Sequence, residues 1–165
     1  MFRVVPLTPE FDRSQFCSGS VPLDRYFREQ VTQDIRRRVT SCYVALDDQE
    51  RPCGFYTLAS TSVLLGDLPA ATAKRLPRYP SIPAIRMGRL AVDRSAHGQG
   101  LGAALFADAL ARSATNEIAA FALVVDAKDD AAVAFYEHHG FIPLTGRPRA
   151  LFLPLATVRN VTRPR

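Results

Sequence analysis

Three glycines fall within the seven residues His97-Gly98-Gln99-Gly100-Leu101-Gly102-Ala103, where an apolar run gives way to a segment rich in alanine and leucine. Glycine has no Cβ, so several backbone N–H groups of such a turn can point at one anion. A helix that starts there adds roughly half a positive charge at its N-terminal end. The turn therefore predicts a binding site for a phosphate group.

Two other interpretations of this turn stay open. The spacing Gly98-x-Gly100-x-x-Ala103 also satisfies the dinucleotide-binding fingerprint, although charged residues separate it from the preceding strand. The rest of the chain is too short for the further βα units that a dinucleotide-binding domain needs. The glycines could also serve helix packing alone. Glycine spacing by itself is thus a weak signal for one ligand.

The residues on either side of the turn predict one βαβ unit. We expect a buried strand at 85–92, a helix at 98–112 and a central strand at 118–126. A second, short helix is expected at 130–138, with Gly140 as its C-cap. The chemistry of the protein should gather around this crossover.

The rest of the chain predicts the outer strands and one long helix. Apolar residues at spacings of three and four indicate an amphipathic helix over 22–39. Further strands are expected at 3–7, 42–46, 54–65, 141–144 and 150–155, and a proline-rich surface loop with a candidate short helix at 70–76 is expected over 68–83.

These elements predict an α/β (α+β) fold. Its sheet should be mixed and mostly antiparallel, with six to seven strands, helices on both faces and one central βαβ crossover. A length of 165 residues suits one continuous core, so we expect a single domain over 1–158 and a basic tail over 159–165.

Composition argues against several classes of protein. Charges interrupt every apolar stretch well before the roughly 18 residues of a membrane span, and the N-terminus carries no export signal. Cys17, Cys42 and Cys53 form no CxxC pair, which disfavours a disulfide framework or a zinc site. His138 and His139 end a predicted helix, where they favour the helix dipole. We therefore expect a cytoplasmic protein with no metal and no membrane contact.

The formal net charge is +5, and 19 of the 21 basic residues are arginine, the side chain suited to bidentate phosphate contacts. This excess favours polyanionic partners, although a GC-rich genome can produce it too. A solvated helix face is the alternative for the triplet 36–38. The candidate substrate contacts are Arg36, Arg37, Lys74, Arg75, Arg78, Arg86 and Arg89.

A second motif, Phe135-Tyr136-x-x-x-Gly140-Phe141, follows the glycine turn by about 35 residues. With both motifs in this order, the sequence resembles the GNAT acyltransferases. The resemblance implies that acetyl-CoA is the cofactor and that Tyr136 protonates the departing CoA thiolate; the alternative for Tyr136 is a buried aromatic that completes a helix face. The implied cofactor contacts are Leu90, Ala91, Val92, His97, Gly98, Gln99, Gly100, Leu101, Gly102, Ala103, Asp129 and Phe135.

The sequence departs from the GNAT pattern at two positions. His97 replaces the usual arginine or glutamine, and Asp129 stands where many members have an asparagine. The resemblance therefore leaves side-chain contacts at these two positions unassigned.

Four further stretches resemble the GNAT toxins of type II toxin–antitoxin modules: Gly88–Asp93, Leu76–Pro80, Val125–Asp129 and Leu151–Leu155. The resemblance implies an enzyme that acetylates the α-amine of aminoacyl-tRNA and blocks translation. It also implies a homodimer, neutralisation by a ribbon-helix-helix antitoxin, and contact with operator DNA only through that antitoxin.

The chemistry of the acceptor fits this expectation. An α-amino group has a pKa of about 7.7 to 8, against about 10.4 for lysine, so an aminoacyl ester presents a useful neutral fraction near pH 7. A strong protein base is then unnecessary. An enzyme that acetylates a protein N-terminus or a small amine, and a module that holds CoA without turnover, remain the alternatives.

Overall fold

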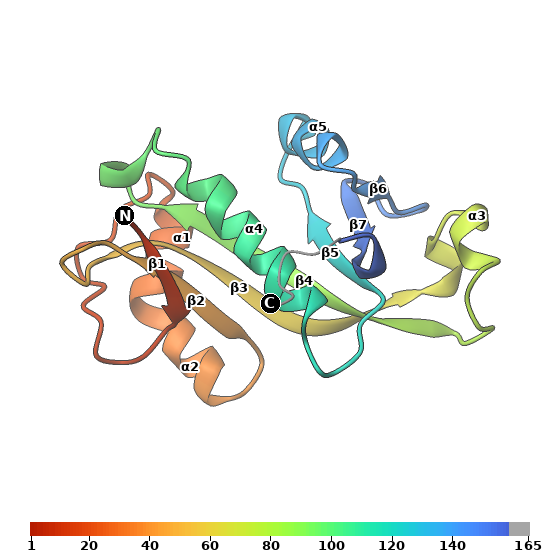
Figure 1. Cartoon of the computed structure of the whole chain (residues 1–165), viewed down its shortest axis with the longest axis horizontal. Helices are drawn as coiled ribbons and strands as arrows, with labels where there is room; N and C mark the ends of the chain where they lie inside the picture. The colour runs from red at the N-terminus through yellow and green to blue at the C-terminus, as the bar shows by residue number, and fades with distance from the viewer. Residues whose placement is uncertain (159–165) are drawn as a thin grey trace, which may run out of the picture. The chain divides into compact units, whose positions relative to one another are not determined.

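A computed structural model describes residues 1–158, so the predicted basic tail at 159–165 lies outside the described residues. Within them the strands form a seven-stranded sheet in the order β1-β2-β3-β4-β5-β7-β6 (Figure 1). The strands are β1 (Arg3–Pro6), β2 (Ser41–Leu46), β3 (Pro52–Leu64), β4 (Ser81–Val92), β5 (Ala122–Asp126), β6 (Ile142–Pro143) and β7 (Ala150–Pro154). The pairs β1–β2, β2–β3, β5–β7 and β6–β7 are antiparallel. The predicted mixed, mostly antiparallel fold is confirmed.

Helices separate the strands along the chain. The helices are α1 (Val21–Arg25), the π-helical segment η1 (Tyr26–Gln30), α2 (Val31–Arg36), α3 (Ala70–Ala73), α4 (Leu101–Ala114) and α5 (Asp130–His138), and the 3₁₀ turns are η2 (Leu65–Asp67), η3 (Arg94–Ala96) and η4 (Leu155–Thr157). Because α4 connects the neighbouring strands β4 and β5, it is the helix of the predicted crossover.

The helix predicted over 22–39 is shorter and interrupted. It ends at Arg36, because Arg38 adopts a left-handed φ of 60° and the Val39 N–H turns back to the Asp34 carbonyl at 3.1 Å. Val39, the last residue of the predicted amphipathic helix, is 60% exposed and does not belong to a buried helix face. The π-helical segment η1 adds a residue to one turn, which the simple 3.6-residue periodicity does not anticipate.

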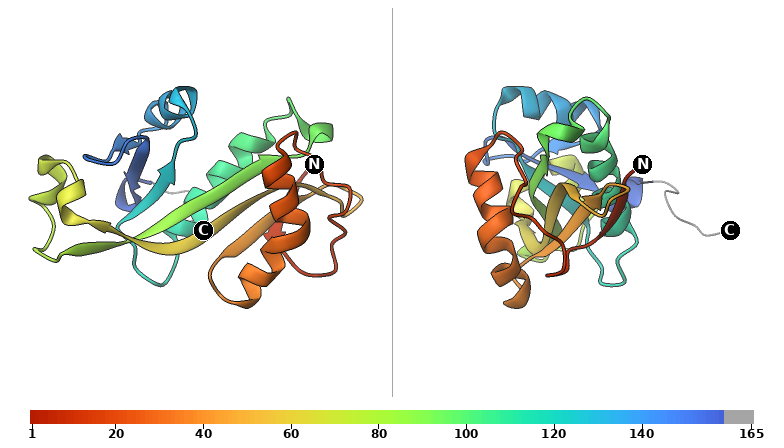
Figure 2. Two further views of the ribbon diagram at one scale, coloured as in Figure 1. Left: turned by 180° about the vertical axis from the view of Figure 1, so that it is seen from behind. Right: turned by 90° about the vertical axis from the view of Figure 1, so that its left-hand side faces the viewer.

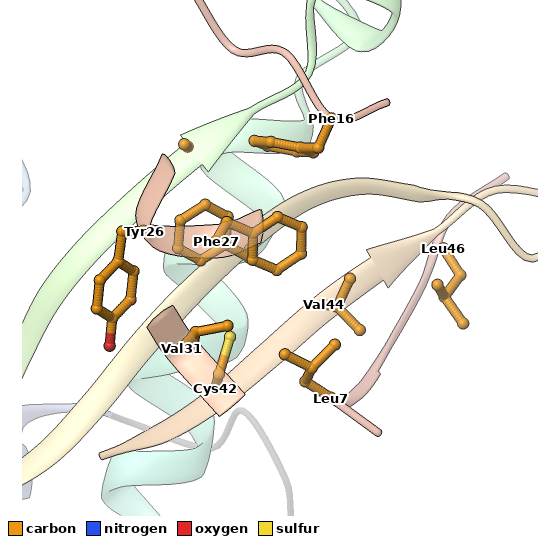
Figure 3. Close-up of a cluster of buried hydrophobic side chains, with 10 residues drawn as sticks. Leu7, Phe16, Tyr26, Phe27, Val31, Cys42, Val44 and Leu46 are labelled. Carbon is orange, nitrogen blue, oxygen red and sulfur yellow. The ribbon is translucent and has the colours of Figure 1, made fainter. Parts of the chain in front are cut away.

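The described chain divides into two compact units, each of which takes part of β3, β4 and α4. The first comprises Met1–Ala59 and Met87–Ala109. In its core the Phe27 ring of η1 stacks on Phe55 of β3 with ring centroids 4.2 Å apart, and Phe16 meets Phe27 edge-on at 4.7 Å. Figure 3 shows the side chains of this core converging from the N-terminal loop, η1, α2 and β2.

The opposite face of β3 receives α4 at Gly54. A Cβ on Gly54 would lie 2.8 Å from Leu105 Cδ1 and 3.2 Å from the Ala91 carbonyl oxygen. Leu105 is fully buried, so it has little room to move. Glycine at this position therefore permits the close approach of the helix to the strand.

We expect Gly54→Ala to lower the free energy of unfolding by about 1 to 3 kcal/mol, the usual cost of overpacking a core. Urea denaturation measures this change. Gly66→Ala is the matched control, because a Cβ there meets no atom within 4 Å, and it should change stability by less than about 0.5 kcal/mol. Equal effects of both substitutions would contradict the packing argument.

The second unit comprises Ser60–Arg86 and the chain from Leu110 onward. In this unit β3 and β4 continue as a long hairpin with α3 at its tip (Figure 2). Val63 and Ile82 of the hairpin share a core with Val124 of β5 and Phe152 of β7. The tip of the hairpin is therefore anchored to the packed part of its own unit.

Two predicted boundaries in this unit are wrong. The loop expected over 68–83 ends earlier, because β4 begins at Ser81. Ile82 and Ala84 of this strand are buried, and the Pro83 carbonyl between them accepts the Phe121 N–H at 2.8 Å. The strand expected to start at Ile118 starts at Ala122, and Ile118 is 78% exposed.

Candidate active site

A short loop leads from β4 into the glycine turn, and Asp93 holds it in place. The Asp93 carboxylate accepts the Cys17 N–H at 2.8 Å, the Ser95 N–H at 3.0 Å and the Ser95 hydroxyl at 2.6 Å. Partial burial by itself raises the pKa of this carboxyl, but the hydrogen bonds from Ser95 and Cys17 outweigh it and hold the pKa below its usual range. The charged form of Asp93 therefore stabilises the start of the turn.

We expect Asp93→Ala to lower the free energy of unfolding by about 1 kcal/mol at pH 7, as for the loss of a capping side chain. Because the pKa of Asp93 is lower in the folded protein, the stabilisation is complete above the unfolded value of about 3.9 and is lost as the pH falls through the folded value. Urea denaturation of both proteins at pH 7 and near pH 3 measures the difference. A stability gap that stays constant over this range would show that the charge of Asp93 contributes nothing.

The glycine turn itself has the geometry of an anion cradle. Gly98 and Gly100 have left-handed φ angles of 77° and 76°, and a Cβ on either would meet no protein atom within 4 Å. Conformation rather than crowding therefore explains these two glycines. Within residues 1–158, no other backbone group accepts a hydrogen bond from Gly98, Gln99 or Gly100. Their N–H groups and the first turn of α4 are thus available to a phosphate.

The side chains of the turn bind back onto the protein. His97 Nε2 donates to the Val92 carbonyl oxygen at 2.8 Å, and Gln99 Nε2 donates to the Ser95 carbonyl oxygen at 3.2 Å. The backbone, rather than these side chains, therefore presents the donors to an anion. A Cβ on Gly102 would lie 3.8 Å from the Val92 side chain, which is an ordinary van der Waals contact, so the space there does not require glycine.

The other cofactor contacts predicted in this unit lie on β4 and α4. Leu90 and Val92 are half-buried, and Ala91 is buried in the core, so Ala91 can offer only its backbone. Leu101 is also buried, whereas Ala103 is exposed on the first turn of α4. Preformed backbone donors, with open space where a Cβ on Gly98 or Gly100 would lie, are features that suit the binding of a phosphate group.

Tyr136 lies on α5 in the second unit and is half-buried. Its ring contacts Phe135 at 5.4 Å and Phe141 at 5.3 Å between centroids. Burial raises the pKa of the Tyr136 hydroxyl above its ordinary value of 10. Tyr136 is therefore protonated at neutral pH, as a general acid must be.

Asp129 is the N-cap of α5. Its Oδ1 accepts the Ala132 N–H at 2.8 Å. The carboxylate therefore helps to start the helix that carries Tyr136, a capping role that asparagine fills equally well.

Phe135 is 44% exposed, and its ring contacts His139 with centroids 4.4 Å apart. His139 Nδ1 bonds to the Phe135 carbonyl oxygen at 2.8 Å. Within residues 1–158, no three His, Cys, Asp or Glu side chains are grouped to hold a metal ion.

The structure divides the predicted substrate cations between the two units. Arg36 and Arg37 are exposed at the end of α2 in the first unit. Lys74, Arg75 and Arg78 are exposed at the hairpin tip in the second.

The two remaining cations have protein partners. Arg86 pairs with Asp126 at 2.9 Å, and Arg147 approaches the same carboxylate at 3.7 Å. The Arg89 guanidinium lies 3.6 Å from the centroid of the Tyr26 ring, and the Tyr26 hydroxyl donates to Asp34 at 2.8 Å. Sequence reasoning missed Tyr26 and Asp34, because only the fold brings these residues next to Arg89.

A mixed sheet, a glycine turn at the start of its crossover helix and a later helix with a half-buried tyrosine are the features expected of an acyl-group transferase. A model of the GNAT acetyltransferase domain matches residues 22–150, which is most of the chain. The chain therefore belongs to the GNAT acetyltransferase family. The predicted enzyme class and its cofactor, acetyl-CoA, are confirmed. No helix within residues 1–158 has the length and apolar character needed to span a membrane.

Toxins that act on tRNA are among the similar proteins. The chain is 39% identical over 132 residues to a tRNA-acetylating toxin of Mycobacterium tuberculosis, covering 79% of this chain and 78% of the toxin. A structure of AtaT complexed with acetyl-methionyl-tRNAfMet superposes with a TM-score of 0.86 and 31% identity, covering 96% of this chain and 97% of AtaT. A tyrosine-to-phenylalanine mutant of AtaT, bound to acetyl-CoA and the C-terminus of the antitoxin AtaR, gives a TM-score of 0.77 and 28% identity, covering 95% of each chain.

Proposed function

We propose that this protein is a toxin that transfers the acetyl group of acetyl-CoA to the α-amine of an aminoacyl-tRNA and so blocks translation. The likeness to AtaT in complex with acetyl-methionyl-tRNA over nearly the whole chain carries the proposal. The exposed cations of the hairpin tip support it, because a polyanionic acceptor needs such partners. A reaction on charged tRNA takes place in the cytoplasm.

The proposed reaction needs few groups from the protein. Acetyl-CoA supplies the thioester whose carbonyl carbon the neutral amine attacks, and the C–S bond then breaks. The backbone donors at Gly98–Gly102 hold the pyrophosphate, and backbone groups of Leu90 and Val92 orient the pantetheine arm. The Tyr136 hydroxyl gives its proton to the departing sulfur, while the amine loses its proton to water. The raised pKa of the half-buried Tyr136 hydroxyl, which keeps it protonated, supports this role.

Acetyl transfer from radiolabelled acetyl-CoA to a pool of charged tRNA tests the proposal. We expect label that is lost with the aminoacyl group when the ester bond is hydrolysed. Label on a polyamine or a peptide N-terminus instead, with charged tRNA left unmodified, would replace tRNA by a small-amine or protein acceptor. Acetyl-CoA binding without transfer to any of these acceptors would favour a CoA-binding module.

The regulatory partners follow from the same proposal. We propose a ribbon-helix-helix antitoxin that neutralises the enzyme and carries it to operator DNA, and a homodimer as the active form. The AtaT structure with the C-terminus of AtaR supports an antitoxin of some kind. Sedimentation equilibrium of the purified protein tests the dimer directly.

A further inference from the structure

The hairpin tip carries unpaired positive charge. From Leu68 to Val92 the sequence has five basic residues and no acidic one. Arg86 and Arg89 of this stretch are held by Asp126 and the Tyr26 ring. Lys74, Arg75 and Arg78 are exposed and form no ion pair within residues 1–158. The tip is therefore positively charged on its solvent side.

An aromatic residue follows these cations in the sequence. Tyr79 follows Arg78 directly, is 62% exposed, and has no hydrogen bond or ring contact within the part of the chain that is described. The other four tyrosines, Tyr26, Tyr43, Tyr56 and Tyr136, all have ring or hydroxyl partners. Tyr79 thus differs from every other tyrosine of the protein in leaving its ring to the solvent.

Hydrogen bonds and packing fix the backbone segment that carries Tyr79. The Leu65 N–H donates to the Pro80 carbonyl oxygen at 3.1 Å, and the Thr145 N–H donates to the Asp67 carbonyl oxygen at 2.8 Å. Leu68 is buried and Leu76 packs against the same core. Pro77 and Pro80 restrict the backbone on both sides of Tyr79. A ring held in this way loses little conformational entropy when it binds a ligand.

An exposed aromatic ring that directly follows unpaired cations along the chain suits one ligand chemistry. Single-stranded nucleic acid offers the flat face of an unpaired base together with adjacent phosphates, whereas the bases of a duplex are stacked on each other. We propose that Tyr79 stacks on an unpaired base of RNA while Lys74, Arg75 and Arg78 contact the flanking phosphates. This inference rests on the proposed function in taking RNA as the substrate.

Fluorescence anisotropy with a labelled eight-nucleotide single-stranded RNA tests the stacking. We expect Tyr79→Leu to weaken binding by about 5- to 100-fold, the usual effect of losing one base–aromatic stack, and Tyr79→Phe to retain wild-type affinity. Loss of a ring removes no charge, so Tyr79→Leu should leave the salt dependence of binding unchanged. Arg78→Ala should instead reduce the slope of log K against log salt by about 0.7.

Three results would overturn the inference. The first is a Tyr79→Leu variant that binds single-stranded RNA with wild-type affinity. The second is equal weakening of binding by Tyr79→Phe and Tyr79→Leu. The third is a Tyr79→Leu variant that loses as much affinity for an RNA duplex of the same length as for the single strand. A change in sedimentation mass with unchanged RNA affinity would likewise make Tyr79 a contact between copies of the chain.

Transfer assays separate this inference from the proposed function. Tyr79-dependent RNA binding in a protein that does not acetylate charged tRNA would leave the inference standing and remove the proposed function. Acetylation of charged tRNA with a KM that Tyr79→Leu does not change would keep the function and remove the inference.

Discussion

Tyr136→Phe is expected to lower kcat for acetyl transfer by about 10²- to 10⁴-fold, the usual contribution of a general acid. The substitution removes one hydroxyl and keeps the ring that contacts Phe135 and Phe141. Packing of α5 and the Kd for acetyl-CoA should therefore stay the same. Single-turnover transfer to charged tRNA and calorimetric titration with acetyl-CoA measure the two quantities.

Tyr43→Phe is the matched control, because Tyr43 is also a half-buried tyrosine stacked on another ring, Tyr56 of the neighbouring strand. It should leave kcat within about twofold of wild type. A folded Tyr136→Phe enzyme with near-normal turnover would remove Tyr136 from the reaction and make it a packing residue of α5.

The pH dependence gives an independent measurement of the same role. The acceptor amine must be neutral, so the rate should rise with pH through about 7.7 to 8. Burial raises the pKa of Tyr136 above 10, and the acid form therefore persists over that whole range. The rate should fall only above pH 10, with an amine acceptor that is stable to base. A decline that begins near pH 8 would point to a different acid.

The features that sequence reasoning predicted correctly are those that short stretches of chain determine. The glycine turn depends on Gly98 and Gly100 having no Cβ, because both adopt positive φ angles. Glycine is the residue that tolerates such angles best, so the sequence itself indicates the turn. The helix over 130–138 has its own N-cap in Asp129 and its own C-terminal glycine, and its bounds were predicted without error. Local signals of this kind need no knowledge of the fold.

The features that were missed depend on contacts between distant residues. Arg89 lies on the Tyr26 ring although 62 residues separate them, and the fold alone decides that this cation is held rather than free. The Arg86–Asp126 pair is of the same kind. Sequence reasoning therefore favoured RNA contact for the whole group from Lys74 to Arg89. Within residues 1–158, the structure gives partners to Arg86 and Arg89 and leaves Lys74, Arg75 and Arg78 without an ion pair.

Gly100→Asp should weaken acetyl-CoA binding by about 10²-fold. Aspartate tolerates the left-handed φ of Gly100 better than most residues, so the turn should persist. Its carboxylate would stand next to the anion that the turn binds. Two like charges at 4 Å repel by about 4 kcal/mol in partly screened surroundings, and the exposure of Gly100 to solvent reduces this to about 3 kcal/mol.

Gly100→Asn separates charge from conformation in this test, because asparagine has nearly the same shape as aspartate and the same tolerance for the left-handed region. We expect the neutral variant to bind acetyl-CoA within about tenfold of wild type, since only the backbone conformation is strained. Isothermal titration at low and high salt measures both variants, and the gap between them should narrow as salt screens the repulsion. Equal affinities of the two variants would mean that no phosphate lies at Gly100, and the cradle would then have to be placed elsewhere on the crossover.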